Sequence, residues 1–468
     1  MTVQGGYIPP GRRKGGKMGK YFGTDGFRGE ANIDLKPEHA FKIGRYLGWY
    51  FSQQHKAKIV LGKDTRRSSY MYENALAAGI TASGADAYLL HVTTTPCVSY
   101  ITRREGFDCG VMISASHNAF YDNGIKLING EGEKMDEALQ DDIERYIDGE
   151  IEELPYAQRD AIGSTVDFYS GRNRYIGYLT TLAAMPFDGK KIALDCANGS
   201  TWMIAGAVFM ALGAEIKVIN NQPDGTNINR GCGSTHIEGL QAFVRDNHMD
   251  CGFAFDGDGD RCLAVDERGE LINGDKIIYV CAKFMKDNGR LPNNTVVTTV
   301  MSNMGLYKAL EREGIVYEQT AVGDRFVYEA MKAGGHLIGG EQSGHIIFRK
   351  HAHSGDGLIT AIMLTEVMMQ TQLPLSALAS GVTMYPQVLT NVVVTDKETA
   401  LSNAAVQEAV KAAESVLGDN GRVLLRASGT EPLLRVMAEA TEETMCQEAV
   451  DSIIAAMERQ GLVIGVRK

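Results

Sequence analysis

The sequence lacks three features that would indicate a membrane, secreted or disulfide-bonded protein. No stretch reaches the roughly 18 consecutive apolar residues that a membrane helix needs. The N-terminus also has no apolar core of the signal-peptide type. The eight cysteines are scattered without a C-x-x-C pair, so we expect reduced thiols in hydrophobic cores rather than a disulfide framework. We therefore expect a cytoplasmic protein with no membrane partner.

Basic charge is also scarce. The chain has 47 Lys and Arg against 58 Asp and Glu, a net charge of −11. Nonspecific binding to nucleic acid needs a basic surface that displaces counterions, so we expect no nucleic-acid partner. An anionic substrate must then be held by local clusters of basic side chains. Residues 1–17 differ, because they contain four basic residues and no acid, and we expect a flexible basic extension there.

The chain is long enough for several domains, because 468 residues exceed what one hydrophobic core usually supports. Short buried strands that lead into helical patterns are typical of α/β units with a largely parallel sheet, and four of them are residues 58–62, 191–195, 250–255 and 295–300. Ligands bind such sheets at the carboxyl ends of their strands.

The C-terminal segment predicts a different, smaller fold. A strand at 388–394 precedes apolar residues at helical spacing, then two strands near Val423 and Val436 and a last helix. We expect an α+β domain there. The predicted organisation is a 1–17 extension, α/β domains at 18–172, 173–272 and 273–384, and a C-terminal domain at 385–468.

Three carboxylates at alternate positions mark one loop, which reads Asp256-Gly257-Asp258-Gly259-Asp260-Arg261. Without a cation these anions would repel one another strongly. An EF-hand calcium loop is one alternative, but Arg261 replaces the glycine required at its sixth position and the flanks predict strands. A solvated acidic turn is another. Three carboxylates leave coordination positions open, which suits Mg²⁺ shared with a phosphate.

A second loop, Ser114 to Asn118, follows a strand-like segment at 107–113. Ser116 could be a nucleophile, a phosphate carrier or a helix cap. No G-x-S-x-G elbow surrounds it, and a neighbouring His117 does not make a catalytic triad, which disfavours a serine hydrolase. Lys126 could be a surface charge, or a proton-transfer group if its pKa is lowered.

Five motifs, in this order from about Lys20 to the C-terminus, resemble those of the α-D-phosphohexomutases. They are Tyr21 to Gly29 (YFGTDGFRG), Ser114 to Asn118, Asp256 to Arg261, Gly340 to His345 (GEQSGH), and Arg426 to Pro432 (RASGTEP). The resemblance implies three domains of one mixed α/β sandwich fold and a smaller α+β domain that closes over substrate, arranged around a central active-site cleft.

The resemblance also implies roles for residues at the transferring phosphoryl group. Ser116 would carry a phosphate and share one Mg²⁺ per chain with Asp256, Asp258 and Asp260. The catalytic set would be Ser116, His117, Arg28 and Lys126.

Substrate would be bound elsewhere, as the resemblance implies. Its phosphate would lie at Arg426, Ser428, Gly429 and Thr430, with Arg435 as an addition. Its hydroxyls would lie at Glu341, Ser343 and His345. Gln342 marks the branch that acts on glucosamine phosphates, because relatives acting on glucose or mannose phosphates usually carry Met there.

The implied reaction is the interconversion of glucosamine 6-phosphate and glucosamine 1-phosphate through a phosphoserine and a hexosamine or hexose 1,6-bisphosphate that turns over in the site. It would supply amino-sugar nucleotides for peptidoglycan precursors. The alternatives are a mutase for glucose or mannose phosphates and a relative that only binds sugar phosphates. A homodimer is compatible with the resemblance.

Two further features of the sequence are the residue that follows the serine loop, Ser114 to Asn118, and a charged run after the predicted strand at 58–62. The family usually has Pro after Asn118, and this chain has Ala119, so we expect a loop that is looser by about 1 kcal/mol of entropy. The run Lys63-Asp64-Thr65-Arg66 predicts a structural ion pair rather than catalytic groups.

Overall fold

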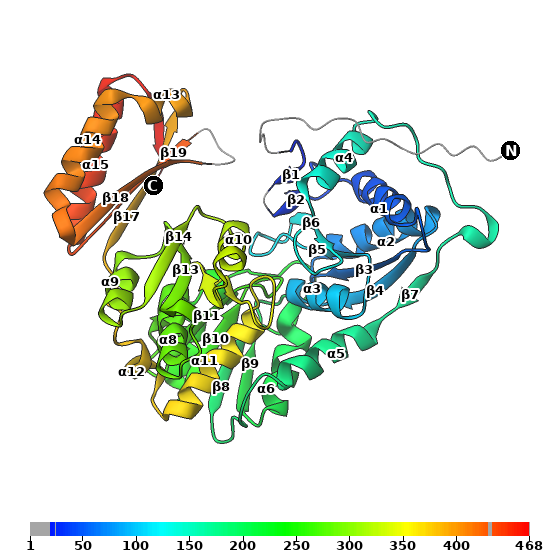
Figure 1. Ribbon diagram of the computed structural model, residues 1–468, viewed down its shortest axis with the longest axis horizontal. Helices are drawn as coiled ribbons and strands as arrows, with labels where there is room; N and C mark the ends of the chain where they lie inside the picture. The colour runs from blue at the N-terminus through cyan, green and yellow to red at the C-terminus, as the bar shows by residue number, and fades with distance from the viewer. Residues whose placement is uncertain (1–18, 24, 429–432, 468) are drawn as a thin grey trace. The chain divides into compact units, whose positions relative to one another are not determined.

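The computed structural model describes residues 19–23, 25–428 and 433–467, so the predicted extension at 1–17 lies outside the described residues. The described residues form four sheets (Figure 1). The chain divides into two compact units, one ending at Asn173 and including Asp224–Ile228, the other formed by the rest. Within the described part of the chain, no helix combines the length and apolarity that a bilayer crossing needs.

The first unit is built on one mixed sheet of seven strands, in the order β1-β2-β6-β5-β3-β4-β7. Strands β5, β3, β4 and β7 run parallel, while β1, β2 and β6 are antiparallel to their neighbours. The strands are β1 (Phe22–Gly23), β2 (Gly26–Glu30), β3 (Lys58–Lys63), β4 (Asp86–Val92), β5 (Cys109–Ile113), β6 (Asp122–Asn129) and β7 (Thr165–Asp167). The helices are α1 (Pro37–Phe51), α2 (Arg67–Ala82), α3 (Thr95–Arg104) and α4 (Glu137–Ile147).

Helices pack on both faces of this sheet, and two glycines allow the close approach of one of them. Apolar residues of β3, β5 and β6 form one core with α1, α2 and α4, which lie together above the strands in Figure 1. On the other face, a Cβ at Gly62 would lie 2.4 Å from Val98, and one at Gly110 would lie 2.2 Å from Thr102, both on α3. The two glycines therefore allow α3 to pack directly on the backbone.

A glutamate fastens the N-terminal strands to this core. Both carboxylate oxygens of Glu144, on α4, accept backbone N–H groups, from Lys20 at 2.8 Å, Tyr21 at 2.8 Å and Phe22 at 2.7 Å. Hydrogen bonds to a charged acceptor are among the stronger ones in proteins. Glu144 thereby fixes the start of the hairpin that carries Arg28.

The second unit contains two further mixed sheets, joined to the first unit through α5 (Tyr169–Thr180). One has the order β12-β11-β10-β8-β9 and the other β14-β13-β15-β16. Their strands are β8 (Lys191–Asp195), β9 (Glu215–Ile219), β10 (Cys251–Phe255), β11 (Cys262–Asp266), β12 (Leu271–Ile272), β13 (Thr295–Thr299), β14 (Val316–Thr320), β15 (Ile338–Gly340) and β16 (Ile346–Phe348). Their helices are α6 (Ala205–Ala211), α7 (Glu238–Asp246), α8 (Gly274–Asp287), α9 (Met304–Arg312), α10 (Asp324–Gly334), α11 (Gly357–Thr371) and α12 (Leu375–Ala379).

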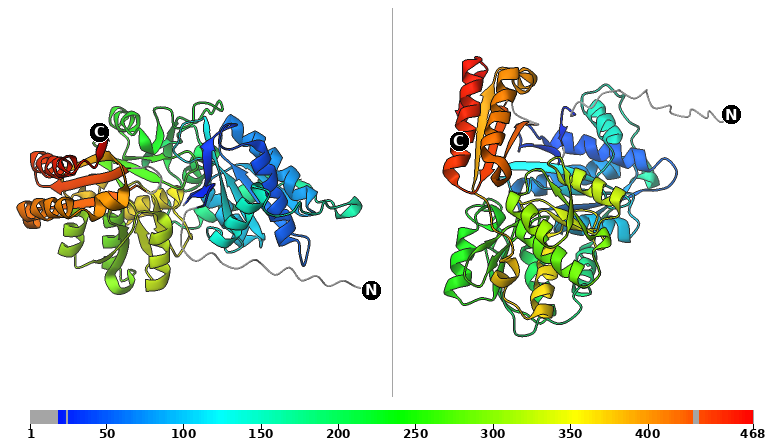
Figure 2. Two further views of the ribbon diagram at one scale, coloured as in Figure 1. Left: turned by 90° about the horizontal axis from the view of Figure 1, so that it is seen from above. Right: turned by 60° about the vertical axis from the view of Figure 1, so that its left-hand side comes forward.

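The fourth sheet is antiparallel, with the order β18-β19-β17-β20. In both views of Figure 2, α14 and α15 lie side by side on one face of it, where their apolar residues form a separate core. The elements are β17 (Gln387–Val394), α13 (Lys397–Ser402), α14 (Ala404–Leu417), β18 (Gly421–Ala427), β19 (Leu433–Ala440), α15 (Glu443–Arg459) and β20 (Val463–Arg467). The fold class predicted from the sequence is confirmed, with α13 and β20 as additions; the predicted domain boundaries stay predictions.

The first three sheets share one topological feature. In each, a strand that is parallel to its sheet neighbour is followed by an antiparallel strand, at β5–β6, β10–β11 and β15–β16. The turns between them are residues 114–121, 256–261 and 341–345. These turns contain the serine, acidic and GEQSGH motifs. In the fourth sheet, the last predicted motif begins in the last two residues of β18.

The C-terminal sheet is attached to the third sheet through a buried glutamate. Glu439, on β19, accepts the N–H of Met304 at 3.0 Å, at the start of α9, and Nε of Arg422 at 2.8 Å. Close by, Asp275 accepts the N–H of Asn303 at 2.7 Å. Burial, with a smaller contribution from Glu439, raises the pKa of Asp275 to about 7.

Asp275 makes stability depend on pH. Its folded-state pKa lies above the unfolded value near 3.8, so the neutral carboxyl favours folding, and this contribution is lost as pH rises through about 7. We expect the melting temperature of the wild type to fall relative to that of Asp275→Asn between pH 5 and pH 8, by an amount equivalent to at most about 3 kcal/mol, because about two pH units separate pH 5 from the folded-state pKa of about 7. Differential scanning calorimetry across this range measures it.

Asp287→Asn is the matched control, because Asp287 lies on the same helix with its side chain 56% exposed. This variant should follow the wild type at every pH. If the difference in melting temperature between wild type and Asp275→Asn stays constant from pH 5 to pH 8, the raised pKa assigned to Asp275 is wrong.

Candidate active site

The serine loop begins directly after β5 and holds Ser116 in an unusual backbone conformation. Ser116 is buried and has a φ of 52°, in the left-handed region that residues with a side chain rarely adopt. Its N–H donates to Oγ of Ser114 at 3.0 Å, and its own Oγ lies 3.2 Å from Nδ1 of His117. The predicted pair Ser116 and His117 is therefore in hydrogen-bonding contact.

A buried ion pair supports this loop from below. Arg66 and Asp64 have side chains with no exposed surface, and they form a salt bridge. Oγ of Ser114 donates to Asp64 at 2.6 Å. Nη2 of Arg66 donates to the carbonyl oxygens of Ser116 at 3.1 Å and of Asn118 at 2.7 Å. The ion pair was predicted from the sequence, but its contact with the serine loop was not.

Cationic side chains gather on two neighbouring strands of the same unit. In the antiparallel register Arg28 of β2 lies opposite Gly124, and Lys126 is two residues after Gly124 on β6, so Arg28 and Lys126 share one face of the sheet. A Cβ at Gly124 would meet the carbonyl oxygen of Ser114 at 2.6 Å. Glycine at this position thus lets the cationic strands approach the serine loop.

Asp25 lies among these cations. It is 3.4 Å from Nη2 of Arg28 and 3.1 Å from Nζ of Lys134. Burial acts to raise the pKa of Asp25, but Lys134, Arg28 and Lys126 together hold it well below its usual value. The carboxylate stays ionised and fixes the orientation of the cations. Lys134 was not predicted, because it belongs to no motif; in the structure it forms an isolated antiparallel bridge with Ile128.

The acidic loop lies in the second unit, in the turn between β10 and β11. Asp256 and Asp258 are fully buried and Asp260 is nearly so. One carboxylate oxygen from each of the three lies within 4.8 Å of the others. Hard oxygen donors at this spacing suit a divalent cation such as Mg²⁺. The predicted metal ligands Asp256, Asp258 and Asp260 are thus brought together; Ser116 belongs to the first unit.

Backbone hydrogen bonds hold the acidic loop in shape. The carbonyl oxygen of Gly257 accepts the N–H of Ser200 at 2.8 Å, and that of Gly259 accepts the N–H of Gly357 at 3.0 Å. Asp256 also accepts the N–H of Arg261 at 3.1 Å. The loop is therefore anchored both to the segment after β8 and to the start of α11.

The start of α11 carries a buried acid that the sequence did not indicate as part of the site. Asp356 caps the helix by accepting the N–H groups of Leu358 and Ile359, each at 3.0 Å, and it accepts the hydroxyl of Tyr175 at 2.6 Å. Burial raises the pKa of Asp356 to about 6, and Asp260 contributes in the same direction. Asp356 is therefore a further acidic side chain close to the acidic loop.

The GEQSGH loop, Gly340 to His345, lies beside the start of β11, directly after the acidic loop. The carbonyl oxygen of Gly344 accepts the N–H of Cys262 at 3.0 Å, and that of Gln342 accepts the N–H of Gly274 at 3.0 Å. Of the predicted residues in this loop, Ser343 is exposed, Glu341 is half-buried and accepts the N–H of Gly323 at 3.0 Å, and His345 is buried 3.5 Å from Asp324.

The predicted phosphate loop begins where β18 ends. Arg426 and Arg435 lie directly opposite each other on β18 and β19. Their Nε atoms are buried without a hydrogen-bond acceptor among the described residues. Burial, and then Arg435, lower the pKa of Arg426. Like charges opposite each other in a sheet are destabilising, so this pair suits an anion.

Ser428 is also buried, and its carbonyl oxygen accepts Nζ of Lys397 at 2.8 Å. Lys397 was missed from the sequence because it begins α13, a helix of six residues that the spacing of apolar residues did not reveal. The predicted residues Gly429 and Thr430 lie outside the described residues.

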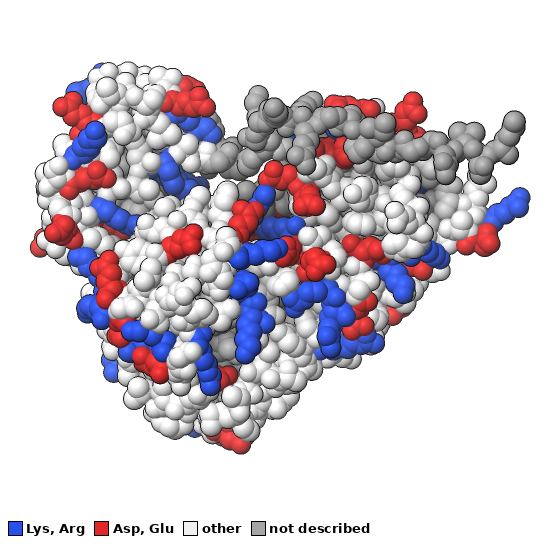
Figure 3. Space-filling view, viewed as in Figure 1, with Lys and Arg blue, Asp and Glu red and all other residues white. Residues whose placement is uncertain are grey.

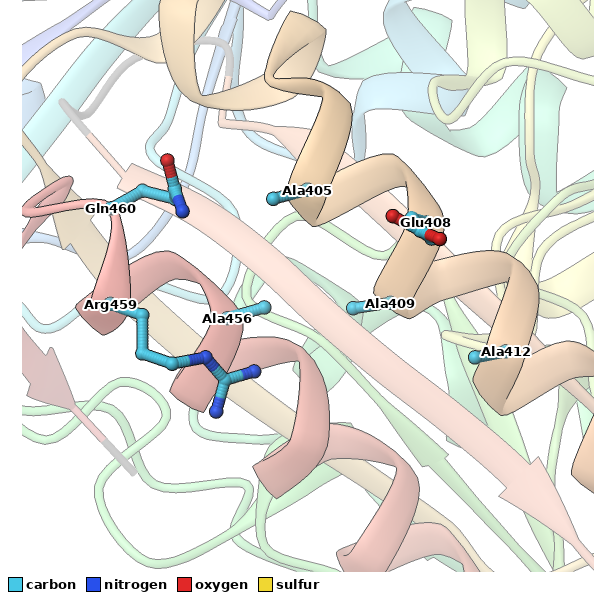
Figure 4. A pocket seen from close by; sticks show the side chains of 7 residues that line it. All are labelled: Ala405, Glu408, Ala409, Ala412, Ala456, Arg459 and Gln460. Atoms are coloured by element: carbon cyan, nitrogen blue, oxygen red, sulfur yellow. The ribbon is translucent and has the colours of Figure 1, made fainter.

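A groove of about 270 Å³ lies away from every predicted site residue, between α14 and α15. Figure 4 shows that small side chains leave this gap; the residues that line it are Ala405, Glu408, Ala409, Ala412, Ala456, Arg459 and Gln460. On the face shown in Figure 3, basic and acidic side chains are intermixed. Neither this groove nor the charge on that face marks the candidate site, which is identified by the residues of its loops.

Comparison with known families gives matches along most of the chain. Four family models match in succession, described as the alpha/beta/alpha domains I, II and III and the C-terminal domain of phosphoglucomutase/phosphomannomutase. They cover residues 19–153, 173–269, 273–385 and 389–456.

Solved structures share the fold at low sequence identity. A phosphoglucomutase/phosphomannomutase family protein from Burkholderia thailandensis has a TM-score of 0.77 at 23% identity, over 95% of this chain and 98% of that one. N-acetylphosphoglucosamine mutase from Aspergillus fumigatus, solved in complex with GlcNAc-6P and magnesium, has a TM-score of 0.69 at 18% identity, over 96% and 97%.

Curated relatives are much closer in sequence. Phosphoglucosamine mutase from Lachnospira eligens is 61% identical over 96% of this chain and 100% of its own length. Phosphoglucosamine mutase from Bacillus cytotoxicus is 49% identical over 93% and 98%. The chain therefore belongs to the phosphoglucosamine mutase family, within the α-D-phosphohexomutase superfamily.

Proposed function

We propose that this chain is an isomerase that interconverts glucosamine 6-phosphate and glucosamine 1-phosphate. The observation that carries the proposal is the 61% identity to a phosphoglucosamine mutase over nearly the whole chain. The groups that phosphoryl transfer requires are also present, namely Ser116 with its neighbouring cations and the three gathered aspartates.

Ser116 is proposed to carry the phosphoryl group as an ester on its Oγ. Phosphoryl transfer asks the protein mainly to align the reacting oxygens and to offset charge on the three equatorial oxygens. Arg28 and Lys126 offset that charge, and His117 orients Oγ through its contact at 3.2 Å. Mg²⁺, one per chain, would be held by Asp256, Asp258, Asp260 and the phosphoserine, and would polarise the ester.

Two half-reactions follow from this assignment. In the direction from glucosamine 1-phosphate, the 6-hydroxyl first takes the phosphoryl group as its bond to Oγ of Ser116 breaks, and its proton passes to the freed Oγ, which gives a 1,6-bisphosphate. The bisphosphate then turns around, and its other phosphate returns a phosphoryl group to the serine. One site must therefore hold the distant phosphate in either orientation. Arg426 and Arg435, with buried Nε donors on facing strands, are suited to this, together with Ser428, Gly429 and Thr430.

The sugar itself is proposed to lie against Glu341, Ser343 and His345, with Gln342 favouring the amino sugar. The glucose and mannose phosphates remain second candidates, because they differ from glucosamine phosphate at C2 alone. We further propose a cytoplasmic location and a sugar phosphate as the principal partner. The intact serine and aspartates argue against a relative that only binds sugar phosphates.

The phosphoserine is tested by Ser116→Ala. We expect mutase turnover to fall by a factor of about 1,000 or more, because the variant has no oxygen to carry the phosphoryl group. The mass of the intact protein should also lose an adduct of one phosphate. Ser452→Ala, on α15 away from the predicted loops, should retain both turnover and adduct. Wild-type turnover by Ser116→Ala would refute the mechanism.

The metal site is tested by the effect of Mg²⁺ on thermal stability. We expect saturating Mg²⁺ to stabilise the wild type by about 1–3 kcal/mol, because it binds the folded acidic loop and relieves repulsion. Asp258→Asn should abolish the shift and, without Mg²⁺, melt no lower than the wild type. Asp246→Asn, whose side chain is 68% exposed, should keep the full shift. A full shift in Asp258→Asn would count against the site.

Specificity is tested by comparing the three hexose phosphates. We expect kcat/KM for glucosamine 6-phosphate to exceed the values for glucose and mannose 6-phosphates by a factor of about 10 to 100. Gln342→Met should narrow this ratio while leaving the melting temperature unchanged, since Gln342 contacts Gly274 only through its backbone oxygen. Equal kcat/KM values for all three sugars in the wild type would exclude the proposed preference.

A further inference from the structure

We infer that Arg66 is a positioning residue for phosphoryl transfer, which acts by holding the backbone of the serine loop rather than by touching substrate. The inference rests on the proposed role of Ser116 as phosphate carrier. Arg66 lies outside that proposed catalytic set. It follows β3 at the N-terminal end of α2, about fifty positions before the serine.

The contacts of Arg66 bracket Ser116 on both sides. Nη2 donates to the carbonyl oxygens of Ser116 at 3.1 Å and of Asn118 at 2.7 Å. Nη1 pairs with Asp64 and donates to Oγ of Ser114 at 3.3 Å. One planar side chain therefore contacts three positions of the loop.

Asp64 extends this support to the amide of Ser116. Its carboxylate accepts Oγ of Ser114 at 2.6 Å, which orients that hydroxyl so that its oxygen accepts the N–H of Ser116 at 3.0 Å. The same carboxylate accepts the N–H of Arg66 at 2.9 Å and Oγ of Ser69 at 2.7 Å. The N–H and the C=O of Ser116 are thus both fixed by a single buried ion pair.

The backbone of Ser116 needs such support. A φ of 52° in a residue with a Cβ costs free energy, and it persists only where surrounding contacts impose it. The direction of Oγ depends on this backbone conformation. If the loop relaxed to an ordinary conformation, Oγ would point elsewhere.

Arg66 also fixes Asn118, two positions after the serine. The carbonyl oxygen of Asn118 accepts Nη2 of Arg66 at 2.7 Å, and its side-chain amide donates to Asp122 at 2.9 Å.

Lysine cannot replace the arginine in this role. An ammonium group would keep the charge beside Asp64, but it is a point donor on a flexible stem and lacks the planar fork that reaches both carbonyl oxygens. A misplacement of the reacting oxygen by about 1 Å can cost about a hundredfold in rate. Arg66→Lys should therefore slow the chemical step more than substrate binding.

The test compares Arg66→Lys with Arg45→Lys. Arg45 lies in the same unit, has no exposed side-chain surface, forms an ion pair with Glu153 and donates to the carbonyl oxygen of Leu154 at 2.5 Å. It therefore reproduces the burial and chemistry of Arg66 away from the serine loop. Ser114→Ala is a second, smaller variant, which removes the link between Asp64 and the amide of Ser116 together with the contact of Arg66 with Oγ of Ser114.

Each variant is incubated with glucose 1,6-bisphosphate and Mg²⁺, and three quantities are measured. They are the phosphorylated fraction of Ser116, the half-life of that phosphoserine, and kcat and KM. We expect kcat to fall about 10- to 100-fold in Arg66→Lys and in Ser114→Ala, with KM within about threefold of wild type. The phosphoserine half-life should change in these two variants and stay at the wild-type value in Arg45→Lys.

Three results would overturn the inference. One is a folded Arg66→Lys with wild-type kcat, and another is a change in KM alone. The third is an equal loss of kcat in Arg45→Lys, which would show a general cost of changing a buried arginine. If Arg66→Lys does not fold, wild-type kcat in Ser114→Ala overturns it. Absence of phosphate from Ser116 in the wild type would instead refute the proposed function.

Discussion

Like charges are concentrated at two of the functional loops, and keeping them together is the constraint on which the rest of the structure depends. Asp256, Asp258 and Asp260 present three carboxylates within 4.8 Å, and Arg426 faces Arg435 across a strand pair. Such groups repel one another unless a ligand of opposite charge is bound. The polypeptide must therefore hold these loops in place against the repulsion. It does so mainly with backbone hydrogen bonds from neighbouring segments.

The topology of the sheets provides these bonds repeatedly. Each of the first three sheets places a functional turn between a strand parallel to its neighbour and the antiparallel strand that follows, where two strand ends fix the base of the turn. In two of them, the segment after an earlier parallel strand then supports that turn. Asp64 and Arg66 after β3 hold the serine loop, and Ser200 after β8 donates to Gly257 of the acidic loop. In the third sheet the corresponding segment instead holds the C-terminal domain, through Asn303 and Met304.

The elements and loops with a local sequence pattern could be predicted, whereas contacts between residues far apart in the sequence could not. The strand at 191–195 and the α14 and α15 helices agree with their prediction because each has a strong apolar pattern of its own. The acidic loop was predicted because its three ligands lie within five positions. The role of Arg66 was not, since nothing in a linear sequence shows that it reaches the carbonyl oxygen of Ser116. The same holds for Tyr175, which meets Asp356 across 181 positions.

Residues Asp224–Ile228 belong to the first compact unit, although the residues on either side of them belong to the second. Gly225 accepts the N–H of Arg67, the residue that follows the arginine under the serine loop, at 3.0 Å. A fragment that stops at Asn173 would leave this donor at the start of α2 without its acceptor. The first compact unit is therefore discontinuous in the sequence, and a minimal version of it needs residues 224–228 joined back by a linker or supplied as a separate peptide.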